Sequence, residues 1–229
     1  MTHPLKIAII DNSIKPEMYR PVEHWASFFE AEFESFSAPQ NQYPNLDHGF
    51  THLIVTGSEA SIIHRDAWVD KEIDVVKSAL DRGIPILGSC WGHQLLALVL
   101  SGPESVRRAP VPEIGWLPIR ILEGRDFFGI KDSFHAFALH FDEVVNLGSD
   151  FHILASTDDC SIHAFQYQDR PVWGVQSHPE IDITNGNALL EDFLLVKPEA
   201  EQFIRKALDA EKCDSGSIRD ILSRFISCR

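Results

Sequence analysis

The chain has 229 residues, of which 44% are apolar, and this length and composition predict a single folded domain with a full hydrophobic core. Its formal charge of −14 comes from 34 acidic and 20 basic residues, without a long run of one sign. Nucleic acid and anionic membranes repel such a surface, so we expect neither as a partner. The sequence has neither a signal-peptide pattern nor an apolar run near the roughly 20 residues of a membrane span, so we expect a cytoplasmic protein.

Cysteine and histidine spacing indicates no metal site. The four cysteines are far apart and form no Cys-x-x-Cys pair, so each is expected to be a free thiol. Five histidines lie in or near predicted strands without the spacing of metal ligands: His52, His135, His140, His152 and His163. A Gly-rich phosphate-binding loop is also absent from the sequence. We therefore expect neither a metal nor a cofactor.

Strand and helix patterns alternate in the first hundred residues. Residues 6–10, 51–55 and 84–87 are short apolar runs that predict buried strands. Residues 66–82 carry apolar side chains at steps of three and four, which predicts a helix, and spaced aromatic and acidic residues predict another over residues 17–33. Strands that alternate with helices favour a parallel sheet covered on both faces.

Strand patterns are more frequent in the second half. Residues 116–122, 152–156, 161–166 and 172–176 alternate or run apolar between turn residues, which indicates antiparallel pairing for some of them. Helical patterns follow over residues 185–196, 198–210 and 217–226. The expected fold class is α/β, with a mostly parallel, doubly wound sheet flanked by helices and a small antiparallel extension. We expect residues 1–229 to form one domain, with a C-terminal helical segment over about 198–229.

Cys90 stands where a predicted strand turns into a predicted helix, within Gly88-Ser89-Cys90-Trp91-Gly92. Glycines two residues to either side allow the cramped backbone of such a turn. The partial positive charge at a helix N-terminus favours thiolate over thiol. The pattern therefore predicts a cysteine nucleophile held above the carboxyl end of the sheet.

A nucleophilic cysteine needs a base, and the base needs a partner that orients it. His178-Pro179-Glu180 follows the predicted strand 172–176 and offers an imidazole with a carboxylate two residues away. Attack on an amide also needs donors for the oxyanion. The backbone N–H of Trp91 and the strand-ending loop Thr56-Gly57-Ser58 are the candidates.

These motifs together resemble the class I (triad) glutamine amidotransferases. The resemblance covers about residues 5–195 and includes five motifs in the order that the family has them. They are Val55-Thr56-Gly57-Ser58, Gly88-Ser89-Cys90-Trp91-Gly92-His93-Gln94, Glu113-Ile114-Gly115-Trp116, His140-Phe141-Asp142-Glu143-Val144 and His178-Pro179-Glu180. The family has a flavodoxin-like α/β fold, which agrees with the expected class.

The resemblance implies a specific chemistry. Cys90 would attack the side-chain amide of glutamine, His178 would protonate the departing ammonia, and Glu180 would hold His178. Water activated by His178 would then release glutamate from the thioester. Motif positions also assign oxyanion donors to the backbone N–H groups of Ser58 and Trp91, and substrate contacts to Gly57, Gln94, Phe141 and Asp142.

One departure from the family pattern leaves the substrate open. Gly57-Ser58-Glu59 stands where many members have Gly-Gly-Pro, and it resembles stand-alone members similar to GMP-synthase glutaminases and plant γ-glutamyl peptidases. Hydrolysis of glutamine and cleavage of γ-glutamyl peptides or amides by the same triad both remain candidates. A non-catalytic binding module is a third, which the complete Cys-His-Glu set argues against.

The partner is open as well. Family members normally pass ammonia to a synthetase domain or subunit, but only 49 residues follow Glu180, too few for an ATP-binding synthetase domain. The resemblance therefore implies either a separate synthetase subunit or hydrolysis without a partner. The expected ligand is glutamine or another γ-glutamyl small molecule.

Overall fold

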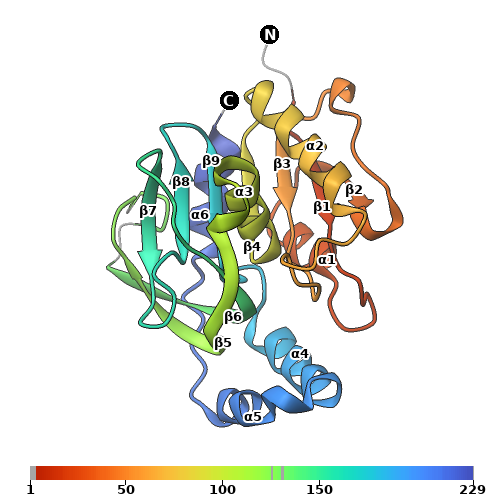
Figure 1. Cartoon of the computed structure of the whole chain (residues 1–229). Coiled ribbons are helices and arrows are strands. Elements are labelled where there is room, and N and C mark those ends of the chain that lie inside the picture. The colour runs from red at the N-terminus through yellow and green to blue at the C-terminus, as the bar shows by residue number, and fades with distance from the viewer. Residues whose placement is uncertain (1–3, 125, 130–131, 229) are drawn as a thin grey trace.

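In the computed structural model, which describes residues 4–124, 126–129 and 132–228, nine strands form one mixed sheet (Figure 1). Its strand order is β2-β1-β3-β4-β9-β8-β7-β5-β6. The strands are β1 (Lys6–Asp11), β2 (Glu32–Ser37), β3 (His52–Val55), β4 (Ile86–Ser89), β5 (Val106–Ile121), β6 (Ser133–Val144), β7 (Phe151–Ser156), β8 (Ala164–Tyr167) and β9 (Val172–Val175). The helices are α1 (Pro21–Ala26), α2 (Val69–Asp81), α3 (Trp91–Ser101), α4 (Ile183–Val196), α5 (Glu201–Asp209) and α6 (Ile218–Ser227).

Parallel pairing joins β2, β1, β3, β4 and β9. Strands β8, β7, β5 and β6 continue the sheet with antiparallel pairing. This sheet, flanked by helices, confirms the predicted α/β class. Because parallel strands end at one edge, the turns after β3, β4 and β9 come together there.

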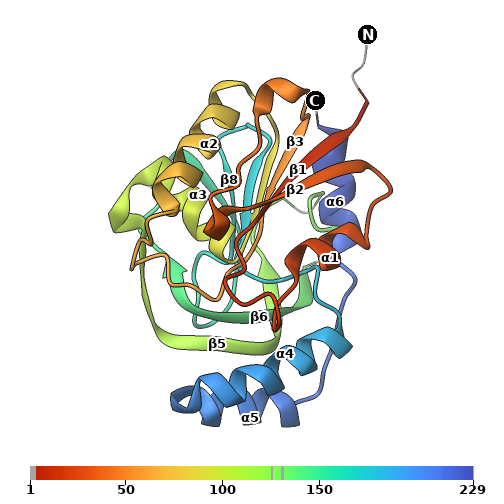
Figure 2. The same ribbon diagram turned by 90° about the vertical axis from the view of Figure 1, so that its right-hand side faces the viewer.

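Helices cover both faces of the parallel strands. On one face α2 and α3 bury Val76 and Leu95 against β3 and β4, and on the other α1 and α6 bury Trp25 and Phe225 against the same sheet. Figure 2 shows these two layers with the sheet between them. Near-continuous apolar strands such as β1 fit this arrangement, since a sheet covered on both faces has no solvent side.

The ribbon of β5 and β6 curves beneath the parallel strands, and α4 and α5 lie on its outer side (Figure 2). Trp116 and Phe137 of the ribbon pack with Leu190 of α4 and Ala207 of α5. Gly115 has a φ of 111°, and a Cβ there would come within 2.8 Å of the Ala207 side chain. The close approach of α5 to β5 therefore requires glycine at this position.

Two sequence predictions differ from the structure. The helix predicted over residues 17–33 is wrong except for the short α1, because the chain turns after Ala26 and enters β2. β2 is an edge strand with mostly exposed side chains, among them Phe33, so it carries no buried-strand pattern. The other difference is β6, for which no strand was predicted, together with a β5 that begins ten residues before the predicted strand 116–122.

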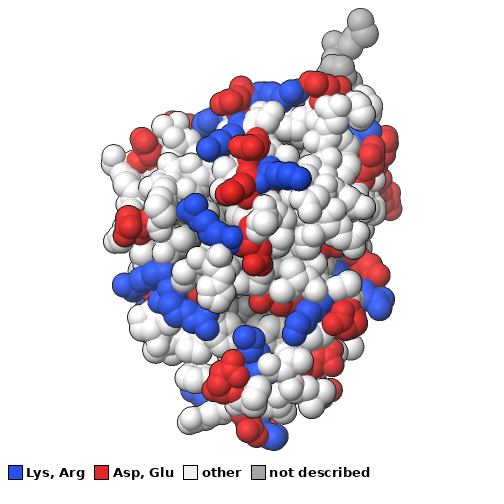
Figure 3. All heavy atoms as spheres, turned by 45° about the vertical axis from the view of Figure 1, so that its right-hand side comes forward, with Lys and Arg blue, Asp and Glu red and all other residues white. Residues whose placement is uncertain are grey.

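The surface mixes the two signs of charge. Acidic and basic side chains are interspersed over the face drawn in Figure 3, as expected for a chain without long charge runs. Among the described residues, none of the helices combines the length and apolar character needed to cross a bilayer.

Candidate active site

Cys90 lies at the sharp turn between β4 and α3, where the sequence predicts it. Its φ of 47° and ψ of −100° are unusual for a residue other than glycine, a strain that costs on the order of 1–3 kcal/mol and persists only where the surroundings hold it. A Cβ at Gly88 would come within 2.5 Å of the Gly92 backbone, and one at Gly92 would collide with the carbonyl group of Val55. Both glycines therefore permit the turn that presents the cysteine.

His178 and Glu180 lie beside Cys90, just beyond the end of β9. The backbone N–H of His178 donates to the Phe137 carbonyl at 2.7 Å, which fixes the residue against β6. Its Nδ1 is 2.9 Å from Glu180 Oε1, and its ring is also hydrogen-bonded to Cys90. All three side chains are buried, with exposed fractions of 4% or less. The fold thus brings together the cysteine, the imidazole and the carboxylate that the sequence predicts as a group.

The charges of this group favour a protonated imidazole. Burial alone would lower the pKa of His178, but the negative charges of Cys90 and Glu180 and the hydrogen bonds to both raise it well above its ordinary value of 6.5. An imidazolium next to a thiolate is the form in which a cysteine attacks and the histidine has a proton to give.

Tyr19, for which the sequence predicts no role, contacts the same pair. Its hydroxyl donates to Glu180 Oε1 at 2.9 Å and lies 3.2 Å from His178 Nδ1. Burial and then the charge of Glu180 raise the pKa of the Tyr19 phenol well above 10, so it stays protonated. The residue stands in the segment mispredicted as a helix, and no motif marks it.

Replacing Tyr19 with Phe is expected to lower kcat about 10-fold while leaving KM nearly unchanged. A hydrogen bond to a charged group contributes about 1.5–3 kcal/mol, and here it orients the carboxylate that holds His178. Steady-state kinetics would measure the change. Tyr167→Phe in β8 is the matched control, and an equal loss there would contradict this role for Tyr19.

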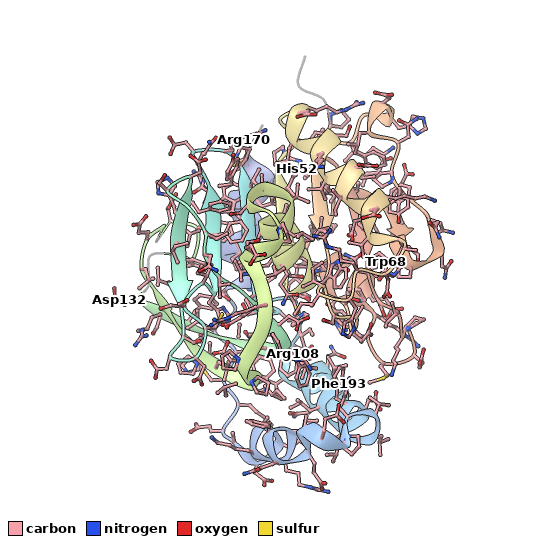
Figure 4. The ribbon with its side chains drawn as sticks, viewed as in Figure 1. His52, Trp68, Arg108, Asp132, Arg170 and Phe193 are labelled. Atoms are coloured by element: carbon pink, nitrogen blue, oxygen red, sulfur yellow. The ribbon has the colours of Figure 1, made fainter. Side chains whose placement is uncertain are left out.

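A pocket of about 280 Å³ opens next to Cys90. Of the predicted substrate and oxyanion residues, Ser58, Gln94, Phe141 and Asp142 line it. Arg108 of β5 and Phe193 of α4 line it as well, and both are labelled in Figure 4 between these elements. The pocket therefore joins the elbow to the β5–β6 ribbon and to α4.

Gly57 and Trp91 hold the site from behind rather than lining the pocket. A Cβ on Gly57 would come within 2.5 Å of His178 Cε1, so glycine lets the loop after β3 pack against the imidazole. The Trp91 side chain is 1% exposed and its indole N–H donates to Glu72 Oε2 at 3.2 Å. Trp91 is the first residue of α3, next to Cys90, so its backbone is the part near the pocket.

Protein contacts already use parts of the substrate residues. Gln94 donates its side-chain amide to the Asp142 carbonyl at 2.8 Å and to Gln176 Oε1 at 3.2 Å. The Asp142 carboxylate accepts from Ser61 at 2.5 Å and from Arg108 at 3.1 Å. The chain thus fixes the geometry of this wall of the pocket.

Comparison with known proteins identifies the family. The family model described as "Glutamine amidotransferase class-I" matches residues 22–197. The chain belongs to this family. The match includes the elbow, the loop after β3 and the His178-Pro179-Glu180 turn, so the expectation from the sequence motifs is confirmed at the level of the family.

Individual relatives of this class I glutamine amidotransferase are subunits named for GMP synthesis. A subunit of the glutamine-hydrolysing GMP synthase of Methanosphaera stadtmanae is 40% identical over 116 residues, which span 50% of this chain and 61% of the relative. The corresponding subunit of Sulfolobus acidocaldarius is 36% identical over 149 residues, 64% of this chain and 77% of the relative.

A crystal structure of a glutamine amidotransferase from Thermotoga maritima has the same fold. It superposes with a TM-score of 0.81 at 20% identity and covers 99% of this chain and 100% of that one. At this identity the likeness concerns the fold, which agrees with the sheet described above.

A buried carboxyl, Glu72 of α2, supports the elbow in this glutamine amidotransferase. It is fully buried beneath Trp91, and burial raises its pKa to about 7 although the Trp91 indole donates a hydrogen bond to it. The ordinary value is 4.5. The stability that this group contributes is therefore present below pH 4.5 and is lost as the pH rises through 7.

Replacing Glu72 with Gln is expected to stabilise the protein at pH 8 by up to about 3 kcal/mol and to change little at pH 4.5, since one pKa unit corresponds to about 1.4 kcal/mol. The glutamine carbonyl can still accept from Trp91. Urea unfolding at both pH values measures the difference. The exposed Asp74→Asn on the same helix serves as the control, and a variant that is less stable at pH 8 would contradict the account.

Proposed function

We propose that the chain hydrolyses the side-chain amide of glutamine through a glutamyl thioester on Cys90 and releases glutamate and ammonia. The observation that carries this proposal is the buried contact of Cys90 with His178 and of His178 with Glu180, beside a pocket that opens at the thiol. Membership of the glutamine amidotransferase family supports the amide of glutamine as the group attacked.

In this mechanism the Cys90 thiolate attacks the amide carbon. His178 gives its proton to the departing ammonia, and then takes a proton from the water that cleaves the thioester. Glu180 stabilises the imidazolium and fixes its orientation. The backbone N–H groups of Ser58 and Trp91 would donate to the oxyanion, since each stands next to the nucleophile or across the pocket from it.

The wall of the pocket opposite Cys90 would hold the amino-acid head of the substrate. Gln94, Phe141 and Asp142 lie on this wall, and the guanidinium of Arg108 lies over the Phe141 ring at 5.3 Å. Gly57 contributes by keeping His178 in place. A cationic group beside an acidic one suits a substrate that carries both an α-carboxylate and an α-ammonium.

Two further assignments belong to the proposal. We infer that residues 1–229 act as one domain, because α5 and α6 of the C-terminal segment bury Ile204 and Phe225 against the sheet. We also infer that a separate synthetase subunit receives the ammonia, since the relatives described above are themselves named as single subunits of a glutamine-hydrolysing GMP synthase.

A γ-glutamyl peptide or amide is the second candidate substrate, and one observation favours it. Glu59, which stands where many family members have proline, accepts hydrogen bonds from Ser13 at 3.1 Å and from the backbone N–H of Ile14 at 2.9 Å. It therefore fixes the segment after β1 at the rim of the pocket, where the leaving group of a larger substrate would lie.

The kcat/KM for release of glutamate from glutamine and from γ-glutamyl dipeptides distinguishes the two. The proposal predicts that glutamine is the better substrate and that ammonia appears in equal amount with glutamate. A dipeptide preferred by 10-fold or more would replace it with the second candidate. Absence of turnover of either substrate would favour the binding module instead.

A further inference from the structure

A second group of buried polar side chains lies behind the wall of the active-site pocket. It consists of Glu113 on β5, His140 on β6, and Cys160 and His163 in the connection between β7 and β8, each exposed by 5% or less. Donor atoms of Glu113, His140 and Cys160 all lie within 4.8 Å of one another. The mechanism proposed for Cys90 uses none of these four groups.

Local structure explains why these residues meet. Glu113 and His140 are direct partners in the β5–β6 ladder, so their side chains leave the ribbon on the same face. In the turn after β7, the backbone N–H of Thr157 donates to the Cys160 carbonyl, and the Thr157 hydroxyl donates to Glu113. The turn is thereby fixed with its cysteine beside the carboxylate.

The hydrogen bonds of His140 leave a lone pair pointing at a carboxylate. Its Nδ1 is 3.0 Å from the Asp142 carbonyl, which only accepts, so Nδ1 carries the proton. Its Nε2 is 2.8 Å from Glu113 Oε2. In a neutral imidazole two acceptors would therefore face each other, and a cation between them, either a second proton or a metal ion, is needed. A backbone carbonyl on the far nitrogen is the usual arrangement of a metal-bound histidine.

His163 is the observation that favours a metal ion over a proton. Its ring is fully buried, and neither ring nitrogen has a hydrogen-bond partner among the described residues. Its Nε2 lies 3.5 Å from Glu113 Oε2, which directs it toward the same point as His140. A proton shared by Glu113 and His140 leaves His163 and Cys160 unsatisfied, whereas a metal ion would bind both.

We propose that Glu113, His140, Cys160 and His163 form a structural Zn²⁺ site. One thiolate, two imidazoles and a carboxylate are a donor set that suits tetrahedral zinc, and Thr157 supplies the hydrogen bond that orients the carboxylate. The ion would join the β5–β6 ribbon to the β7–β8 turn. The sequence predicts no metal here because the four residues come from three separate segments without a short ligand spacing.

The surface offers a route to the site. A second pocket of about 260 Å³ is lined by Glu113 and Thr157 together with Asp158 and Asp159, whose carboxylates are exposed. Negative charge at the mouth would raise the local concentration of cations. The ion can therefore reach the cluster without passing through the active-site pocket.

Titration of the full, metal-free chain with Co²⁺ as an optical probe and with Zn²⁺ tests the site. We expect one ion per chain, a thiolate-to-cobalt charge-transfer band, and a rise in Tm with Zn²⁺. Cys160→Ser is expected to remove the band and to weaken Zn²⁺ binding more than about 100-fold, because loss of even a hydrogen-bonding partner of a ligand costs about 10–100-fold. Cys213→Ser, at an exposed cysteine, and Cys90→Ser are expected to keep it.

Several results would overturn the site. They are a wild-type chain that binds no Co²⁺ or Zn²⁺, a band that persists in Cys160→Ser, or a band that is lost in Cys90→Ser instead. Near-ultraviolet circular dichroism with chelator present shows whether Cys160→Ser is folded. If it is not, His163→Gln takes its place, with the same expected loss of Zn²⁺ affinity and with the charge-transfer band retained but shifted.

Discussion

Replacing Cys90 with Ala is expected to abolish glutamine hydrolysis, with a fall in kcat of about 10⁴-fold or more. Removal of a nucleophile from a catalytic triad leaves only the contribution of substrate binding and the oxyanion donors. The variant should still bind glutamine, because the pocket wall formed by Gln94 and Asp142 is unchanged. Turnover by ammonia release and binding by calorimetry measure the two effects separately.

The control for this variant is Cys213→Ala, at an exposed cysteine outside the pocket, which is expected to keep full activity. The alanine also relieves nothing of the turn itself, since the strained φ of 47° belongs to the backbone at residue 90. Residual activity of Cys90→Ala within 10-fold of the wild type would show that another residue is the nucleophile.

Replacing Glu180 with Gln is expected to lower kcat by about 10²–10⁴-fold, the range expected when the orienting carboxylate of a triad becomes an amide. The amide has no charge to hold His178 as an imidazolium. Because the charge of Glu180 is among the causes that raise the pKa of His178, its loss lowers that pKa. The variant should therefore also change the pH dependence of the reaction.

The direction of this change follows from the role of His178 as proton donor to ammonia. In the wild type the raised pKa keeps the imidazole protonated above its ordinary value, so activity should fall only well above pH 6.5. In Glu180→Gln the alkaline limb of the kcat/KM profile is expected to move to lower pH. The exposed Glu191→Gln on α4 should leave the profile unchanged, and an unmoved limb in Glu180→Gln would exclude this role.

The reacting group was predictable from the sequence because each part stands at the end of a buried strand. Gly57, Cys90 and His178 follow β3, β4 and β9, which are neighbouring parallel strands in the sheet, and parallel strands deliver such residues to one edge. Short apolar runs bounded by glycine mark these strands clearly. The chemistry and its location thus followed from local patterns.

Residues that reach the site through tertiary packing were not predictable in this way. Tyr19 comes from a loop that precedes α1, and its distance from Glu180 depends on how that loop folds back over β1. The antiparallel ribbon of β5 and β6 was also underestimated, because its side chains are partly covered by α4 and α5 and partly exposed, so neither strand shows a uniform alternation.

The measurement that tests the central claim most directly is the site of covalent labelling by a diazo-ketone analogue of glutamine. The mechanism predicts that the analogue loses N₂ and adds a single mass to Cys90, that excess glutamine slows the reaction, and that turnover is lost in proportion to labelling. An unlabelled Cys90, or an adduct on Cys160, Cys213 or Cys228 that removes activity while Cys90 stays free, would contradict it.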